Sequence, residues 1–158
     1  MIRTSFKLLL EKFPDRDLVG VEVGSASGEN AIAMLNGSKN LTQLYLVDNN
    51  PHGFIHKALK PFESRAVLVV KPSVEASKDF PDKFFDYIYI DADHEFESVC
   101  QDIEVWMPKL KEHGIISGHD WWYKPVRDAV NYSIAKKIIP SLTGCEEINY
   151  LCDWWIIK

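Results

Sequence analysis

Residues 18–30 read LVGVEVGSASGEN, a short apolar run that ends in a glycine-containing turn and leads into helix-forming sequence. The run predicts a buried strand over residues 18–24, because it is short, rich in valine and ended by glycine. Gly24 allows a tight turn, and Gly28 allows close approach of a ligand or of the helix backbone. An ordinary turn between strand and helix is the alternative interpretation.

The spacing of these glycines also bears on the ligand. It is G-x-x-x-G, which differs from the dinucleotide fingerprint G-x-G-x-x-G. Glu22 stands two residues before the first glycine, where its carboxylate would repel a diphosphate. The turn therefore favours a cationic ligand over a pyrophosphate.

The rest of the chain repeats the alternation of apolar strand and helix. Further strands are predicted over residues 41–48, 66–70, 84–91 and 115–118, with helices starting near residues 28, 54, 73, 94 and 126 and an amphipathic helix in residues 1–17. Ser73 is the expected N-cap of its helix. Residues 147–158 contain two strand-like runs separated by Cys152 and Asp153, which predict a terminal antiparallel hairpin.

This order of elements predicts the fold class. Five β–α alternations imply a doubly wound, Rossmann-like α/β fold with helices on both faces of a mostly parallel sheet. With the hairpin, the sheet has seven strands. The length of 158 residues fits a single domain, residues 1–158.

Composition excludes several classes of protein. The hydrophobic fraction of 46% is that of a globular chain, and the formal net charge of −5 argues against a surface that tracks nucleic-acid phosphates. The apolar run near the N-terminus is too short for a signal peptide or a membrane span. Three cysteines and the lack of a secretory leader indicate a reducing compartment. We therefore expect a cytoplasmic protein with neither a membrane nor a nucleic acid as partner.

Polar residues gather where the predicted strands end. In a doubly wound sheet the ligand lies beyond the carboxyl ends of the strands, so one edge brings together residues 24–28, Asp48, Ser73, Asp91 and Asp120. An acidic residue that closes the second strand, as Asp48 does, typically accepts hydrogen bonds from ribose hydroxyls. The alternative is a turn cap, since Asp48-Asn49-Asn50-Pro51 is also good turn sequence.

Two further groups of residues carry candidate chemistry. Asp91, Asp93 and His94 follow the fourth strand, where they can hold a divalent metal or supply a general base. We expect Asp93 to cap the next helix instead, and the role of His94 is left open. His119 and Asp120 follow the fifth strand and can meet Asp91 across the sheet edge.

Aromatic residues follow this second acidic position. Trp121, Trp122 and Tyr123 can cover a flat or apolar substrate, although we expect at least one of the two tryptophans to be part of the core. Trp154 and Trp155 are assigned to structure.

These motifs resemble those of a known family. Residues 21–30, VEVGSASGEN, resemble motif I of the class I S-adenosylmethionine-dependent methyltransferases, with Asp48 as the acidic residue of motif II. The segment IDADHEFESVCQDIEVWMPKLKEHGIISGHDW, residues 90–121, followed by KPVRDAV, is similar to the methyltransferase 24 group, which is related to catechol and caffeoyl-CoA O-methyltransferases. The resemblance implies S-adenosylmethionine as cofactor, with contacts from Glu22, Gly24, Ser25, Ala26, Gly28, Asp48, Asn49, Ser73, Val74 and Asp91.

The resemblance also implies a catalytic group and a reaction. Metal-dependent members bind magnesium or a similar ion with a carboxylate matching Asp91 and with an Asp-Asn pair; Asp120 matches that Asp, but Trp121 replaces the Asn. Either His94, His119 or Asp93 completes the shell, or no metal binds. Asp91, His119 and Asp120 are the expected catalytic residues, and methylation of a hydroxyl on a small molecule is the expected reaction.

Three alternatives stay open at this point. A protein of this fold could bind the cofactor without transferring methyl groups by itself, because a short chain leaves little room for a substrate lid; it would then act as a homodimer or with a partner subunit. A nicotinamide-dependent oxidoreductase is disfavoured by Glu22 and by the glycine spacing. A nucleic-acid methyltransferase is disfavoured by the acidic charge and by DADH, residues 91–94, where an N-P-P-Y-type tetrapeptide would stand.

Overall fold

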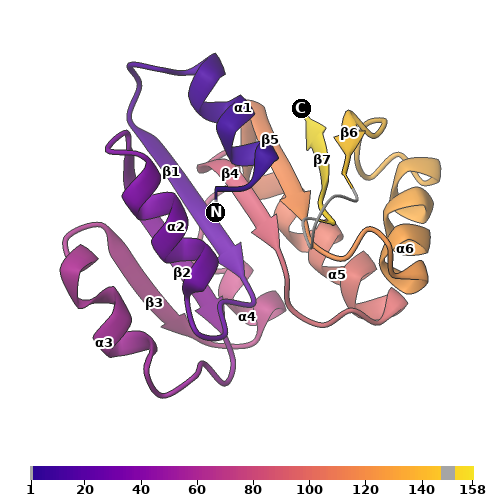
Figure 1. The fold of residues 1–158 in the computed structure, drawn as a ribbon. Coiled ribbons are helices and arrows are strands. Elements are labelled where there is room, and N and C mark those ends of the chain that lie inside the picture. Colours follow the sequence, from indigo (N-terminus) through magenta and orange to yellow (C-terminus); the bar gives the residue numbers. More distant parts are fainter. Residues whose placement is uncertain (1, 147–151) are drawn as a thin grey trace.

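The computed structural model describes residues 2–146 and 152–158, and the strands within these ranges form one seven-stranded sheet (Figure 1). The strand order is β3-β2-β1-β4-β5-β7-β6. The strands are β1 (Leu18–Val23), β2 (Leu41–Asp48), β3 (Ala66–Val70), β4 (Phe85–Ile90), β5 (Leu110–Gly118), β6 (Gly144–Cys145) and β7 (Trp154–Ile157). The first five are parallel, and β7 runs antiparallel to β5 and to β6. The predicted doubly wound, Rossmann-like sheet is therefore confirmed.

Helices cover both faces of this sheet (Figure 1). They are α1 (Thr4–Lys12), α2 (Glu29–Gly37), α3 (Ile55–Leu59), α4 (Ser73–Ser77), α5 (Phe96–Trp106) and α6 (Lys124–Ala135), with 3-10 turns at Lys60–Phe62 and Met107–Lys109. Apolar residues of α1, α2 and α3 pack in one buried layer, and those of α4, α5 and α6 pack in the other. The helix predicted to start near residue 94 forms α5, which the 3-10 turn at Met107–Lys109 follows.

The central strands supply both layers because successive side chains point to opposite faces. In β4, Tyr87 and Tyr89 face the layer of α1 and α2, whereas Ile88 and Ile90 face the layer of α5. All six residues of β4 are buried. A strand that is buried on both faces needs apolar residues at successive positions. This need explains the high β propensity of the β4 sequence.

The order of strands also places the site. The chain leaves β1 toward β2 on one side and returns to β4 on the other, so the strand order reverses between β1 and β4. Loops that leave the carboxyl ends of these two strands in opposite directions open a crevice between them. The turn after β1 and the loop after β4 are therefore the walls of the expected ligand site.

Several predicted boundaries need correction. The antiparallel pair at the end of the chain is β6 with β7, but β6 lies at Gly144–Cys145, before the predicted run 147–151, which lies outside the described residues. Strand β5 starts at Leu110 instead of residue 115. Ser73 was predicted as the N-cap of its helix, but it is the first residue of α4 and Pro72 occupies the N-cap. The Ser73 hydroxyl donates to Asp102 instead of capping the helix. Among the helices of the described residues, none has the length and apolar character needed to cross a membrane.

Candidate functional site

The turn after β1 is built so that only glycine fits at position 24. Gly24 has φ +88°, and a Cβ placed there would lie 2.1 Å from the Asp91 carbonyl oxygen. Its N–H donates to the Val47 carbonyl at 2.8 Å, which ties the turn to the end of β2. The glycine therefore lets the ends of β1, β2 and β4 meet without a side chain between them.

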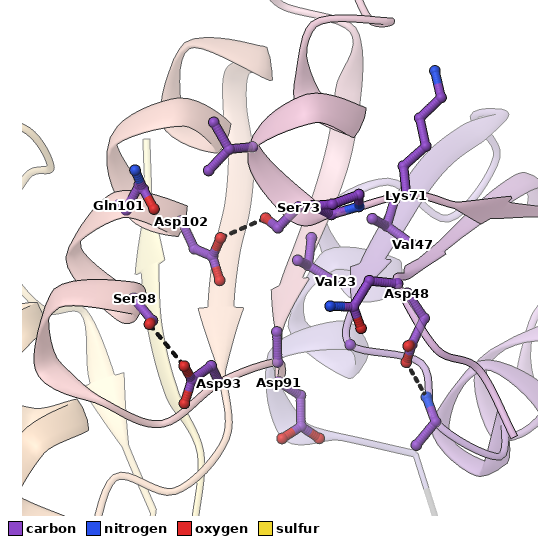
Figure 2. A pocket seen from close by; sticks show the side chains of 16 residues that line it. Val23, Val47, Asp48, Lys71, Ser73, Asp91, Asp93, Ser98, Gln101 and Asp102 are labelled. Atoms are coloured by element: carbon purple, nitrogen blue, oxygen red, sulfur yellow. Dashed lines mark hydrogen bonds between the residues drawn. The ribbon is translucent and has the colours of Figure 1, made fainter.

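A cavity of about 470 Å³ opens at this junction, a volume within the range of small-molecule sites (Figure 2). Its walls come from the turn after β1, the end of β2, the loop between β3 and α4, the loop after β4, and α5. The lining residues are Val23, Gly24, Ala26, Val47, Asp48, Asn49, Lys71, Pro72, Ser73, Val74, Asp91, Ala92, Asp93, Ser98, Gln101 and Asp102.

The cavity unites most of the residues predicted to bind a cofactor: Gly24, Ala26, Asp48, Asn49, Ser73, Val74 and Asp91 all line it. Three others are not among the lining residues. Glu22 and Ser25 are buried, and Gly28 packs against Ile55 of α3.

Glu22 is buried and only partly hydrogen-bonded. Its Oε1 accepts from Asn30 Nδ2 at 2.9 Å, and its Oε2 has no partner. Asn30 in turn accepts from the Arg3 guanidinium at 3.3 Å. Burial raises the pKa of Glu22 to about 8, because an ionised carboxylate is costly without water. Glu22 is therefore protonated at neutral pH unless a cation approaches it.

Asp48 stands at the end of β2, where its carboxylate faces the cavity (Figure 2). Its two oxygens accept the backbone N–H groups of Ala26 and Asn50, each at 2.8 Å. The same carboxylate thus organises both loops, so the binding role and the turn-cap role predicted for Asp48 are compatible.

Asp91, His94 and Asp120 form a compact cluster at the ends of β4 and β5. His94 Nε2 lies 3.3 Å from Asp91 Oδ1 and 2.9 Å from Asp120 Oδ2. One potential ligand atom from each of the three lies within 4.8 Å of the others. The hydrogen bond to Asp91, with the charge of Asp120, raises the pKa of His94. Asp91 and Asp120 do share one site, as their positions at neighbouring strand ends predicted.

His119 lies at the border of this cluster. Its Nδ1 is 3.2 Å from Asp120 Oδ1 and 3.8 Å from Asp91 Oδ1. Asp93 stands apart, because its oxygens accept from the Glu95 N–H at 3.2 Å and from the Ser98 hydroxyl at 2.8 Å. It thus organises the start of α5, although Glu95 is the N-cap residue.

The aromatic residues after β5 divide between core and surface. Trp121 is buried, whereas Trp122 is 58% exposed and donates from its indole Nε1 to Asp120 Oδ1 at 3.0 Å. Trp154 is buried, and Trp155 packs against the layer of α1 and α2. One of the first two tryptophans is therefore core, as expected, and the other is available beside the cluster.

Sequence reasoning missed the α5 wall of the cavity. Ser98, Gln101 and Asp102 line it, and Asp102 accepts a hydrogen bond from Ser73. The available signal was the acidic residue Asp102 beside Ile103, in a helix with many apolar residues.

Charge distinguishes this cavity from a nucleotide-phosphate site. Its described lining contains the carboxylates of Asp48, Asp91, Asp93 and Asp102 and one basic residue, Lys71. The Lys71 ammonium pairs with Asp79, outside the lining. Such a cavity disfavours phosphates and suits a neutral or cationic ligand. Fold and site together define a Rossmann-like protein with a small-molecule site at the strand-order reversal.

Comparison with known proteins identifies the family. The model of the methyltransferase 24 family, described as a methyltransferase domain, matches residues 21–121. The chain therefore belongs to this methyltransferase family, and the resemblance read from its motifs is confirmed. No curated protein matches.

Solved structures share the fold at low sequence identity. A protein from Staphylococcus aureus named for caffeoyl-CoA O-methyltransferases has a TM-score of 0.73 and 18% identity, covering 100% of this chain and 84% of that one. An rRNA methylase from Streptococcus thermophilus has a TM-score of 0.72 and 14% identity, covering 100% and 98%. The 1,6-didemethyltoxoflavin-N1-methyltransferase of Burkholderia thailandensis, solved with S-adenosylhomocysteine, has a TM-score of 0.68 and 11% identity, covering 98% and 75%. This is the fold of S-adenosylmethionine-dependent methyltransferases, and the fold is shared by enzymes with different acceptors.

Proposed function

We propose that this protein binds S-adenosylmethionine in the cavity and transfers its methyl group to a hydroxyl of a small molecule held at Asp91, His94 and Asp120. The observation that carries the proposal is the lining itself. Four carboxylates surround one lysine that is paired elsewhere, and Asp48 closes β2 where a ribose would lie. This arrangement suits a sulfonium cation with a nucleoside and disfavours the diphosphate of a nicotinamide cofactor.

Glu22 supports the choice of a cationic cofactor. Its Oε2 has no partner and the group is buried beneath the motif I turn. A buried carboxylate of this kind is stabilised by a nearby positive charge, such as the ammonium group of the cofactor's methionine part. The cofactor's ammonium group would add to the effect of Arg3, whose charge acts on Glu22 without offsetting its burial.

The chemistry is an in-line displacement. The acceptor oxygen forms a bond to the methyl carbon as the carbon–sulfur bond breaks, and the sulfur keeps the electron pair and becomes neutral. The hydroxyl proton passes to His94, whose imidazole is held between two carboxylates that stabilise its protonated form. Positioning of the two reactants supplies much of the rate.

The cluster also fits a divalent cation. Asp91, Asp120 and His94 would provide two carboxylate oxygens and an imidazole nitrogen, a set that suits manganese or another transition metal better than magnesium. When bound, such an ion would lower the pKa of the acceptor hydroxyl. His119 and Trp122 both lie against Oδ1 of Asp120, and they would hold this carboxylate in place while its Oδ2 faces His94.

The acceptor is proposed to be a small molecule for reasons of charge. The acidic chain offers little attraction to a nucleic acid, and Trp122 presents an exposed indole beside the cluster. A homodimer or partner subunit that completes the acceptor site, and a cytoplasmic location, stay predictions from the sequence.

Calorimetric titration with S-adenosylmethionine and S-adenosylhomocysteine, with and without magnesium or manganese, tests the proposal. We expect both ligands to bind, and Asp48→Ala to weaken binding at least about 30-fold through the lost ribose contacts. Asp15→Ala, an exposed acidic residue away from the cavity, is the matched control and should bind as the wild type does. Failure of the folded wild-type protein to bind either ligand would refute the proposal.

The metal is tested by the same titration with the ion alone. Manganese binding that is lost in Asp120→Asn but retained in Asp93→Asn would support a metal at the cluster. Equal binding by all three proteins would place the ion elsewhere and leave His94 as the base.

A further inference from the structure

The outer edge of strand β3 lacks the features that usually keep an edge strand from pairing with another chain. Its sequence, AVLVV, contains neither a charged residue nor a proline, and its register with β2 is regular along the whole strand. Natural edge strands carry charges, prolines or bulges, because their unpaired backbone groups are a template for a further strand. Strand β3 stands at one end of the strand order and at the left-hand end of the sheet in Figure 1. This edge is therefore suited to pairing.

The opposite edge of the sheet is formed differently. Strand β6 lies there and is two residues long, Gly144–Cys145. A very short edge strand offers few backbone groups to another chain, and shortness is one of the ways in which proteins protect a sheet edge. Of the two edges that the described residues form, β3 is thus the one that can accept a further strand.

The backbone groups of alternate β3 residues point away from the sheet. The Arg65 carbonyl accepts the Leu44 N–H at 2.7 Å, so Arg65 faces β2. Parallel pairing on one side uses the N–H and C=O groups of every second residue. The groups that are left to point outward are those of Ala66, Leu68 and Val70.

A second copy of the chain fits this edge. If two β3 strands run antiparallel about Leu68, Leu68 lies opposite its counterpart and Ala66 lies opposite the partner's Val70. All of these residues direct their backbone groups outward, so each pair exchanges both of its N–H···O bonds. Pairing about Val67 or Val69 would leave one outward residue of each copy without a partner. A surface that is complementary to itself in this way is what a two-fold dimer requires.

The side chains of this edge are complementary as well. Val70 is 57% exposed, and a groove of about 310 Å³ runs between β3 and α3. Ala66 and Val70 share one face of β3, so the partner's Val70 would lie over the small Ala66 in this groove. On the other face, Val67 is 39% exposed and would lie opposite the partner's Val69. Pairing therefore removes from water the apolar surface that a single copy leaves exposed. The groove is lined by His56, Leu59, Lys60, Glu63, Ala66 and Leu68.

The charges next to β3 are compatible with this pairing. Antiparallel pairing about Leu68 brings Arg65 near the partner's Lys71. Arg65 donates to three backbone carbonyls of its own copy, and Lys71 pairs with Asp79. Both cations are thus engaged within one copy, which weakens their mutual repulsion.

We infer that the protein forms a two-fold homodimer in which the β3 edges of two copies pair antiparallel about Leu68. This dimer goes beyond the proposed function and does not depend on it. It gives the homodimer predicted from the sequence a specific surface, at the edge of the sheet that lies farthest from β6 in the strand order.

Sedimentation equilibrium of the full chain tests the dimer at protein concentrations from about 1 µM to about 300 µM, which cover the affinities of small interfaces. We expect the wild type to shift from 18.1 kDa to twice that mass. Val67→Lys and Val70→Lys each place a charge at an exposed position of the edge, and each should weaken the dimer at least about 30-fold. Tyr132→Lys is the matched control, because it replaces an exposed residue of α6 with the same cation, and it should form the dimer as the wild type does. Thermal unfolding shows that each variant is folded.

Amide hydrogen exchange measured by NMR locates the interface. In the dimeric wild type, the outward N–H groups of Ala66, Leu68 and Val70 should exchange slowly. On dilution to the monomer, or in Val67→Lys, they should exchange at least about 10-fold faster, because they return to water. The Val69 N–H faces β2 and should stay protected in both states.

Each outcome decides for or against this dimer. A wild-type protein that is monomeric at every concentration overturns it. A dimer that persists in either folded lysine variant, or whose outward β3 amides exchange no more slowly than those of the monomer, overturns it because the copies then meet elsewhere. Loss of the dimer in Tyr132→Lys as well overturns it, because the added charge and not its position would be the cause. Loss in both edge variants with a dimeric control and slowed outward amides supports it. No cofactor is present in these measurements, so none of the outcomes bears on the proposed function.

Discussion

At the scale of single residues, the proposed cofactor site is built on a turn where no side chain is tolerated at position 24. A methyl group at position 24 would meet the Asp91 carbonyl oxygen at 2.1 Å and the Ala92 Cα at 2.5 Å, both backbone atoms that cannot rotate away. The positive φ of Gly24 adds strain for any other residue. Ligand binding and the packing of three strand ends are therefore coupled at one position.

We predict that Gly24→Ala weakens S-adenosylhomocysteine binding by roughly 100-fold or more and lowers the free energy of unfolding by about 2–4 kcal/mol. Calorimetry and urea denaturation measure the two effects. Gly53→Ala is the matched control, because a Cβ there meets nothing within 4 Å. Wild-type affinity in Gly24→Ala would show that the turn does not border the ligand.

From the raised pKa of Glu22 we predict that the protein releases a proton when S-adenosylhomocysteine binds. With a pKa of about 8, Glu22 is protonated at pH 7 in the free protein, and a bound ammonium group favours its ionised form. We expect close to one proton to be released at pH 7 and the affinity to rise between pH 6 and pH 7.5. Titrations in buffers of different ionisation enthalpy count the proton.

The control for this proton is Glu22→Gln, which should bind more weakly with no proton released. Glu29→Gln, an exposed residue on the same loop and helix, should release the proton as the wild type does. A proton count near zero in the wild type would mean that the ligand's cationic group lies away from Glu22.

At the scale of elements, strands were easier to predict than the contacts of helices. Residues 41–48 form β2 as predicted, because an apolar run that ends in Asp-Asn-Asn-Pro has clear boundaries. Parallel pairing then brings Asp48, Asp91 and Asp120 to one edge without further information. The place of Asp102 in the cavity wall could not be predicted, because it depends on the rotation of α5 and on the Ser73 hydroxyl of α4.

Strand β6 was not predicted. The predicted run of residues 147–151 lies outside the described residues, whereas β6 lies at Gly144–Cys145, where the apolar pattern is weak. A Cβ at Gly144 would lie 2.3 Å from the Trp155 ring, so this pairing depends on a close approach to one bulky side chain. A contact of this kind cannot be predicted from the spacing of apolar residues in the sequence.

The end of α2 depends on a single cation from the start of β3. The Arg65 guanidinium donates to the carbonyl oxygens of Leu35, Ser38 and Leu41 at 2.8, 2.9 and 3.0 Å. We predict that Arg65→Ala lowers the free energy of unfolding by about 2–3 kcal/mol, because these carbonyls lose a charged donor. Urea denaturation measures the loss. Lys57→Ala on α3, an exposed cation, should change it by less than about 0.5 kcal/mol, and an equal effect of the two would refute the capping role.

At the scale of the whole molecule, one buried carboxylate joins the sheet at the end opposite the cavity. Asp86 of β4 is fully buried and accepts from the Val19 N–H at 2.9 Å, Arg16 at 2.5 Å and Lys111 at 2.8 Å. These donors come from both neighbouring strands and from the segment before β1. Stability at this end and binding at the other are therefore separable.

We predict that Asp86→Ala lowers the free energy of unfolding by about 1–3 kcal/mol, because the Val19 N–H loses its acceptor and two partly exposed cations lose their partner. At temperatures where the variant is folded, its affinity for S-adenosylhomocysteine should equal that of the wild type. Asp82→Ala removes an exposed ion pair with Lys109 and should change stability by less than about 1 kcal/mol. A stability loss for Asp86→Ala no larger than that of Asp82→Ala would contradict the account.

Buried acids also set how stability depends on pH. Burial raises the pKa of Glu22 to about 8 and those of Asp102 and Asp153 to about 6, above their values in the unfolded chain. A raised pKa gives stability that is full below the unfolded value and is lost as pH rises through the folded value. The melting temperature of the ligand-free protein should therefore fall from pH 5 to pH 8.5, with a shallower fall in Glu22→Gln. A melting temperature that rises over this range would contradict the buried state of these groups.

The crystal structure of the protein with S-adenosylhomocysteine is the most direct test of the central claim. We predict a single ligand in the cavity at the ends of β1, β2 and β4, with its ribose hydroxyls on Asp48 and its sulfur toward Asp91. A ligand found outside this cavity, or one lying in it with the ribose away from Asp48, would contradict the proposed cofactor site.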